Sequence, residues 1–171
     1  ATKEEQEILS RYVGWGGLSE VFDKDNSSFA NEYAQLKSLL SEDEYSMARA
    51  STLNAHYTSP IVIKAIYDAV DRMGFTRGNI LEPSCGIGSF FGMLPDSMQN
   101  SNLYGIELDS ITGRIAKQLY PNAHISINGF ENTELPDSFF DLAIGNVPFG
   151  NYRLNEKKYD NLNFLIHDHF F

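Results

Sequence analysis

Apolar positions change their period partway along this chain, and the change divides it into two parts. Up to about residue 60, hydrophobic side chains recur every three or four positions, which predicts helices over residues 2–13, 31–40 and 41–52. The first and third of these begin with sequences that have the spacing of a capping box. A fourth, amphipathic helix is predicted to start at Pro60 and to end at Gly74.

From residue 79 onward, short apolar runs alternate with helical stretches. We expect strands over residues 79–81, 103–106, 124–127 and 139–144. Helices are expected over residues 89–93, 110–119 and 159–171. Strands separated by helices predict an α/β fold with a parallel, doubly wound sheet. The chain is therefore expected to consist of an N-terminal helical segment, residues 1–55, and an α/β core, residues 56–171.

Polar or glycine residues follow each of the four predicted strands. They are Gly86, Glu107, Asn128 and Asn146. In a parallel sheet of this kind, ligands bind outside the carboxyl ends of the strands, near the point where the strand order reverses. The sequence therefore predicts that these positions converge on one rim and form a binding site.

Composition limits the setting in which such a site works. The chain has 171 residues, 42% of them hydrophobic, and no apolar run approaches the roughly 20 residues of a membrane span. A polar N-terminus and a single cysteine, Cys85, favour a cytoplasmic location without membrane partners. The formal net charge is −10, and no segment concentrates positive charge. If DNA is the substrate, regions outside this chain are expected to supply most of the affinity.

The glycine loop after the first strand is the first candidate for a cofactor site. Gly86 and Gly88 let the backbone pass close to a ligand, although an ordinary strand-to-helix turn is the alternative. Glu107 lies 19 residues after Gly88, at the spacing of the acid that binds ribose hydroxyls in nucleotide-binding folds. The loop lacks the third glycine of pyrophosphate-binding loops, so it fits a cofactor without phosphate, such as S-adenosylmethionine. The ring of Phe130 could pack against the adenine of that cofactor or belong to the core.

The loop after the fourth strand is the candidate catalytic element. The side-chain oxygen of Asn146 and the backbone carbonyl of Val147 are two acceptors for the hydrogens of an amino group. Held by both, an adenine amino nitrogen becomes more tetrahedral and its lone pair more localised. Pro148 restricts the preceding residue, and Phe149 offers a flat surface for a flipped base. A plain turn with Phe149 in the core is the alternative. His167 and His169 lie on different sides of a predicted helix, so no metal site is expected.

These motifs resemble those of amino-type DNA methyltransferases. The resemblance rests on residues 82–90, 105–107 and 140–149, and on residues 56–60 in the motif order of gamma-type adenine enzymes. Across nearly its whole length, the chain is similar to the methylase segment of the large methylase–helicase proteins of conjugative elements, plasmids and phages. Val147 stands where that family usually has proline.

The resemblance implies a fold, a cofactor and a set of roles. The fold would be a Rossmann-like S-adenosylmethionine-dependent methyltransferase sheet, truncated to about four of seven strands, with an N-terminal helical extension. The residues implied in cofactor binding are Tyr57, Thr58, Glu82, Pro83, Cys85, Gly86, Gly88, Glu107, Leu108 and Phe130. Those implied in holding the target base are Asn146, Val147, Pro148 and Phe149. The implied activity is methylation of the exocyclic amino group of adenine in DNA.

Two other functions remain open. A protein glutamine methyltransferase could hold an amide nitrogen with a similar loop, and the acidic balance favours it. A methylase-like module without turnover, within a larger helicase or transfer protein, is the other, because Val147 departs from the family pattern and later strands are absent. If residues 140–144 form an exposed edge strand, we also expect a tendency to self-associate.

Overall fold

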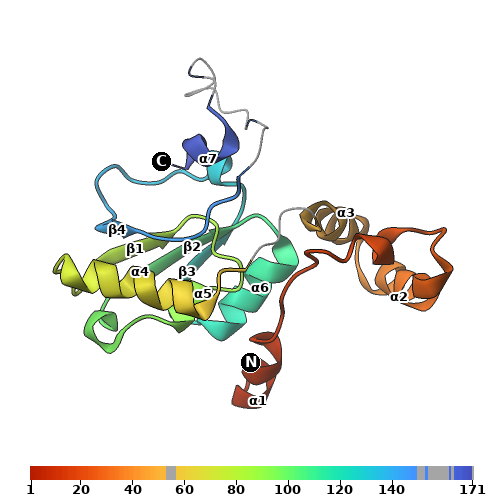
Figure 1. Ribbon diagram of the computed structural model, residues 1–171, viewed down its shortest axis with the longest axis horizontal. Helices are drawn as coiled ribbons and strands as arrows, with labels where there is room; N and C mark the ends of the chain where they lie inside the picture. The colour runs from red at the N-terminus through yellow and green to blue at the C-terminus, as the bar shows by residue number, and fades with distance from the viewer. Residues whose placement is uncertain (53–56, 150–152, 154–161, 163, 171) are drawn as a thin grey trace.

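A four-stranded parallel sheet forms the centre of the molecule in a computed structural model, which describes residues 1–52, 57–149, 153, 162 and 164–170 (Figure 1). The strands are Asn79–Glu82 (β1), Asn102–Glu107 (β2), His124–Ile127 (β3) and Leu142–Ala143 (β4). Their order is β3-β2-β1-β4. The chain moves outward from β1 to β3 and then returns to the other side of β1. Strands β1 and β4 therefore flank a topological switch point, where ligands bind in sheets of this kind.

The helices between residues 60 and 119 pack on one face of the sheet, and another group of helices lies at the N-terminus. The α-helices are Lys3–Leu9 (α1), Ala30–Leu39 (α2), Glu42–Ser51 (α3), Pro60–Arg72 (α4), Ser89–Gly92 (α5), Ser110–Leu119 (α6) and Ile166–His169 (α7). Short 3-10 turns occur at Ser19–Phe22 (η1), Ser27–Phe29 (η2), Asp96–Met98 (η3) and Phe130–Asn132 (η4).

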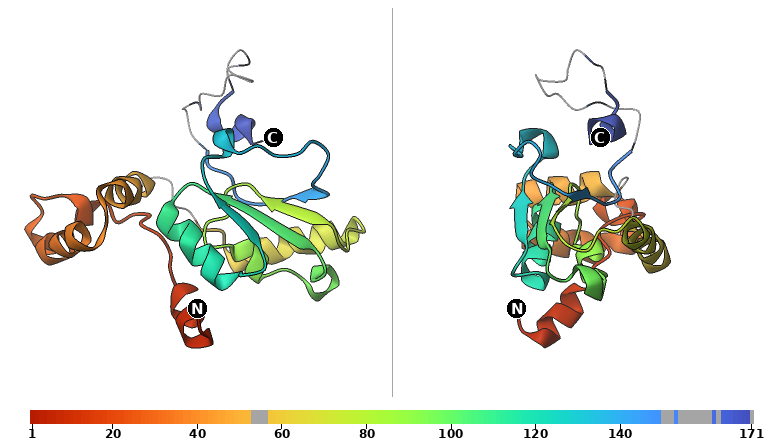
Figure 2. Two further views of the ribbon diagram at one scale, coloured as in Figure 1. Left: turned by 180° about the vertical axis from the view of Figure 1, so that it is seen from behind. Right: turned by 90° about the vertical axis from the view of Figure 1, so that its left-hand side faces the viewer.

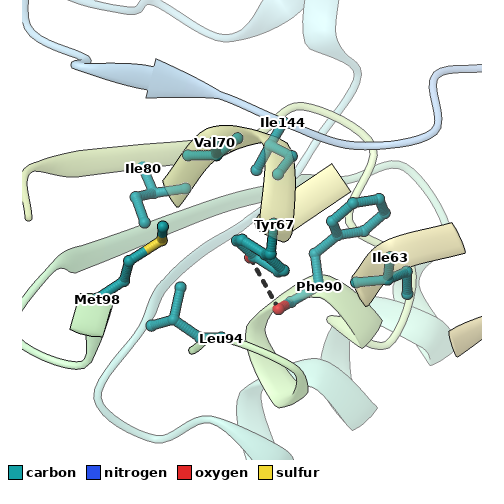
Figure 3. Close-up of a cluster of buried hydrophobic side chains, with 8 residues drawn as sticks. All are labelled: Ile63, Tyr67, Val70, Ile80, Phe90, Leu94, Met98 and Ile144. Carbon is teal, nitrogen blue, oxygen red and sulfur yellow. Dashed lines mark hydrogen bonds between the residues drawn. The ribbon is translucent and has the colours of Figure 1, made fainter. Parts of the chain in front are cut away.

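Helix α4 packs on the sheet through one apolar stripe. Its buried side chains Ile63, Tyr67 and Val70 meet Ile80 of β1 and Phe90 of α5 (Figure 3). The Tyr67 hydroxyl donates a hydrogen bond of 2.9 Å to the backbone carbonyl of Phe90. Such burial stabilises each large apolar side chain by about 1.5–3 kcal/mol. This packing fixes α5 directly after the glycine loop, and so holds the C-terminal end of that loop.

Helix α6 packs through a second cluster next to the first. Cys85, Phe91, Ala116 and Ile125 are all buried there. Asp109 caps the helix, because its Oδ1 accepts the backbone N–H of Ile111 at 2.9 Å. The capped end of α6 thus lies immediately after β2, at the same rim as the glycine loop.

Residues 12–52, which we call the N-terminal lobe, have a small core of their own. Val21, Phe22, Tyr45 and Ala48 are buried together, and Trp15 packs edge-on against Phe22. The lobe lies to one side of the sheet, next to α6 (Figure 2). A salt bridge between Glu44 of α3 and Arg114 of α6 joins the two. Helix α1 reaches the far end of α6, where the Gln6 side chain donates to the Gln118 carbonyl at 2.7 Å.

The predicted fold class, an α/β Rossmann-like sheet with an N-terminal helical extension, is confirmed. The predicted boundary at residues 55 and 56 lies outside the described residues. Both predicted capping boxes form, at Thr2 with Glu5 and at Ser41 with Glu44. Ser59 is the N-cap of α4 but makes no side-chain capping hydrogen bond.

Three predicted elements are shorter in the structure. The first helix ends at Leu9 rather than at residue 13, because the chain then turns to dock against α6. Strand β4 pairs only at Leu142–Ala143, because Phe139 and Phe140 pack against the ring of Tyr104 instead of extending the ladder. Of the predicted helix over 159–171, residues 159–161, 163 and 171 lie outside the described residues. Its described part begins at Ile166, because Leu165 has an extended backbone.

Candidate active site

The two candidate loops meet at the switch point between β1 and β4. A Cβ placed on Gly145 would lie 3.3 Å from Cγ of Glu82 and 3.7 Å from Cδ of Pro83, so the end of β4 passes close to the start of the glycine loop. The backbone N–H of Ile144 donates to the Leu81 carbonyl at 2.9 Å and holds this register. Asn146 therefore follows directly after a segment that is packed against Glu82.

The glycine loop adopts a backbone that other residues disfavour. Gly86 has a φ of 56° and Gly88 a φ of 82°, both in the left-handed region. A Cβ at Gly88 would come within 2.6 Å of the Tyr120 ring, so this glycine also permits close packing from α6. A Cβ at Gly86 would meet only the Tyr57 ring, at 3.7 Å. A Cβ would therefore fit at Gly86 in ordinary contact with Tyr57, whereas at Gly88 it would clash with Tyr120.

Glu107, at the end of β2, ties the glycine loop to the start of α6. Its Oε2 accepts the backbone N–H of Gly86, and its Oε1 accepts the backbone N–H of Asp109, each at 2.8 Å. Burial raises the pKa of Glu107, and the two backbone hydrogen bonds oppose that rise. Each carboxylate oxygen can still accept a further hydrogen bond. The side chain therefore shapes the loop and keeps acceptor capacity toward a ligand.

Glu82 is a second carboxyl at the same site, and it is more deeply buried than Glu107. The residue is only 2% exposed, and its Oε2 has no hydrogen-bond partner. Burial raises its pKa well above the ordinary range, and the nearby charge of Glu107 adds to the rise. A buried polar atom without a partner costs about 1–3 kcal/mol, so an unpaired acid facing a cavity is unusual unless a ligand completes it.

A cavity of about 390 Å³ lies between these loops, within the range of roughly 300–1,000 Å³ typical of small-molecule sites. Four acidic residues line it, namely Glu82, Glu107, Asp109 and Glu131. Among the described residues that line the cavity, there is no lysine, arginine or histidine. The cavity is therefore suited to a ligand with positive charge and unsuited to phosphate groups.

All of the predicted site residues except Gly88 line this cavity. The roles assigned to them stay predictions. Leu108 is 64% exposed and Phe149 also 64%, so both present apolar surface at the mouth. Phe130 stacks on Phe170, the residue that follows α7, with ring centroids 4.6 Å apart, so Phe170 covers one face of the ring expected to meet adenine. His56, the first residue of the upstream motif, lies outside the described residues.

Several residues that line the cavity were not predicted from the sequence. They include Asp109 and Thr112 at the start of α6, and Ile166 and Phe170 from the C-terminal part. The N-terminal lobe contributes Gly14 together with Met47, Ala50 and Ser51 of α3. The glycine run at residues 14–17 is the one sequence signal of a close approach in that lobe. No periodic pattern could have shown that α3 faces the cavity.

In the ranges that the structure describes, no three histidine, cysteine, aspartate or glutamate side chains are grouped so that they could hold a metal ion. No helix within the described part of the chain is long and apolar enough to span a membrane.

No family model matches the chain, but two viral proteins are similar to it in sequence. Defense against restriction protein B of Escherichia phage P1 is 27% identical over 151 residues, which are 87% of this chain and 5% of the phage protein. Type II methyltransferase M.CvrRI of Paramecium bursaria Chlorella virus XZ-6E is 36% identical over 75 residues, which are 44% of this chain and 19% of that protein. The chain thus spans only a small part of the length of the relatives it matches.

Among solved structures, the chain overlaps with a TehB-like SAM-dependent methyltransferase from Corynebacterium glutamicum. The TM-score is 0.40 at 22% identity, and the overlap covers 70% of this chain and 53% of the other. A TM-score of this size describes a partial overlap, so the fold class rests on the strand order of this chain itself.

Proposed function

We propose that this chain binds S-adenosylmethionine and transfers its methyl group to the exocyclic amino nitrogen of adenine in DNA. One observation carries the proposal. The glycine loop, the acids Glu82 and Glu107 and the loop from Asn146 to Phe149 surround one cavity at the switch point of a Rossmann-like sheet. The similarity to a viral Type II methyltransferase, at 36% identity over 75 residues, supports methyl transfer as the activity.

The residues of the cavity fit this cofactor. S-adenosylmethionine has no phosphate and carries a sulfonium and an ammonium group, which suits a cavity lined by acids and no base. The unpartnered oxygen of Glu82 would accept from the ammonium group. Glu107 would accept from the ribose hydroxyls. Gly86, which lines the cavity and has no Cβ, lets the backbone lie against the cofactor.

The loop after β4 would hold the target amino group. When bound, S-adenosylmethionine supplies an activated methyl group on its sulfonium sulfur. The side-chain oxygen of Asn146 and the carbonyl of Val147 accept the two amino hydrogens and localise the nitrogen lone pair. The exposed ring of Phe149 gives a stacking surface for a base that has left its duplex. Catalysis then depends mainly on holding the two reactants in line.

The acidity of the chain is the observation that favours a second candidate, methylation of a glutamine side chain in a protein. The formal net charge is −10, and the cavity adds no basic residue among those described. A phosphate backbone would be repelled by such a surface, whereas a neutral or basic peptide would not. We favour DNA because of the motif resemblance, and we expect the DNA affinity of this chain alone to be weak and to fall steeply with salt.

A transfer assay distinguishes these candidates. The chain would be incubated at high concentration and low salt with S-adenosylmethionine carrying a labelled methyl group. Three substrates would be offered in parallel: single-stranded DNA, duplex DNA and glutamine-containing peptides. Labelled N6-methyladenine in the digested DNA supports the proposal. Labelled methylcytosine or methylglutamine would overturn the choice of substrate. Saturable cofactor binding with no label in any substrate would identify a module without turnover.

A further inference from the structure

The N-terminal lobe lines part of the cavity, although the sequence analysis predicted a binding site made of α/β core residues alone. Gly14 and three residues of α3, namely Met47, Ala50 and Ser51, lie in its wall. Ala50 is exposed, so it does not belong to the small core of the lobe and faces the cavity instead. The lobe therefore presents a surface to any molecule that enters.

Contacts along α6 set the position of this surface. Arg114 of α6 pairs with Glu44 of α3, and α1 is held to the end of the same helix at Gln118. Between them, the hydroxyl of Tyr12 is shielded from solvent and lies close to Thr112 and Asp109. Thr112 donates to Asp109 at 2.7 Å, and both line the cavity. The lobe is thus joined to the helix that begins just after Glu107.

The glycine run links α3 to the same wall. The backbone N–H of Gly17 donates to the carbonyl of Thr52 at 3.2 Å, and Trp15 packs into the lobe core against Phe22. Gly14 has a φ of 67°, which lets the chain turn between Tyr12 and Trp15. Gly14 therefore lies in the cavity wall directly before Trp15, which is anchored in the lobe core.

We propose that the N-terminal lobe forms one wall of the cofactor site, with Gly14 and the Met47–Ala50–Ser51 face of α3 contacting the nucleoside end of the ligand. This inference rests on the proposed function for the identity of the ligand. The nucleoside end is assigned because the lobe docks beside Glu107, Asp109 and Thr112 rather than beside the loop of Asn146. The lobe is then part of the binding site and not only a neighbouring module.

Two matched substitutions test the inference. Ala50→Phe adds a ring on the cavity face of α3, whereas Ala34→Phe adds the same ring at an exposed position on α2 that does not line the cavity. Each variant is titrated with S-adenosylhomocysteine by calorimetry, and circular dichroism checks its helix content. We expect Ala50→Phe to weaken binding by about tenfold or more and Ala34→Phe to leave it within about twofold of wild type.

Hydrogen exchange gives a second readout that does not depend on a variant. Saturation with S-adenosylhomocysteine should slow amide exchange in residues 12–17 and 47–52 as well as in the glycine loop. Protection confined to the α/β core, or equal affinities for both phenylalanine variants and wild type, would overturn the inference while leaving the proposed function intact. A wild-type chain that does not bind the ligand would overturn both.

Discussion

Replacing Glu107 with alanine should destabilise the fold even without any ligand. The carboxylate accepts the backbone N–H groups of Gly86 and Asp109, each at 2.8 Å, and alanine would leave both without their acceptor. Loss of a partner costs about 1–3 kcal/mol for a buried amide, and both amides are only partly buried. We therefore take the lower part of that range, about 1–2 kcal/mol each, which gives about 2–4 kcal/mol in total.

One effect of Glu107→Ala opposes this loss of stability. Burial raises the pKa of Glu107, so removing the carboxylate also relieves some desolvation cost. Glu107→Gln keeps one oxygen that can accept one of the two N–H groups, so its loss should be about half that of alanine. Urea unfolding of the wild type and the two variants measures these differences. An alanine variant within about 0.5 kcal/mol of wild type would refute the reasoning, because a change of that size is ordinary for surface positions.

The same comparison decides how ligand-binding variants should be interpreted. If the loop loosens when Glu107 is lost, weaker cofactor binding by the alanine variant combines a disordered loop with a missing ribose contact. The glutamine variant separates these effects better, since it retains part of the support of Gly86.

Three further predictions concern the binding site and the edge strand of the sheet. Glu82→Gln should raise the free energy of unfolding at neutral pH. Because the pKa of Glu82 is raised, the folded chain keeps a proton that the unfolded chain releases above about pH 4.5. The stability of the wild type therefore falls as pH rises from about 4.5 toward the raised pKa of the folded chain. A difference between variant and wild type that does not grow with pH in urea unfolding would contradict this. Gly88→Ala should lower the melting temperature more than Gly86→Ala. Both substitutions strain a left-handed backbone, at about 1–2 kcal/mol, but only the methyl group at position 88 would lie 2.6 Å from a ring, that of Tyr120. Gly86→Ala should instead weaken cofactor binding. Equal melting temperatures would argue against that difference. Self-association through the edge strand β4 should appear in sedimentation at high concentration and be removed by Ala143→Lys, which places a charge on the exposed edge; a monomeric wild type would rule it out.

Local chemistry made much of the fold predictable. Capping residues fix helix starts through bonds to neighbours in sequence, so the boxes at Thr2 and Ser41 could be seen without a structure. The alternation of apolar runs and helices also gave the parallel sheet, because a parallel pair requires a crossover. Convergence of the glycine loop, Glu107 and Asn146 followed from the same logic, since the carboxyl ends of parallel strands share one rim.

Tertiary contacts decided what the pattern could not. Phe139 and Phe140 have strand-like sequence, yet they pack on Tyr104 rather than pair with a neighbouring strand. Tyr12 continues the apolar period of the first helix, but its hydroxyl lies near Thr112 on α6 and the helix ends before it. The place of α3 beside the cavity depends in part on the pairing of Glu44 with a residue 70 positions away. Such long-range contacts leave no periodic trace in a single sequence.

Calorimetric titration of the wild-type chain with S-adenosylmethionine is the most direct test of the central claim. We expect saturable binding at one site per chain and tighter binding of S-adenosylmethionine than of S-adenosylhomocysteine, because only the former carries the sulfonium charge that an acidic cavity favours. We also expect weaker binding to Glu82→Gln, because a bound ammonium group would displace the proton that Glu82 keeps in the free chain, whereas glutamine cannot become a charged acceptor. Absence of binding by a chain shown to be folded would contradict the account, as would affinity unchanged by Glu82→Gln.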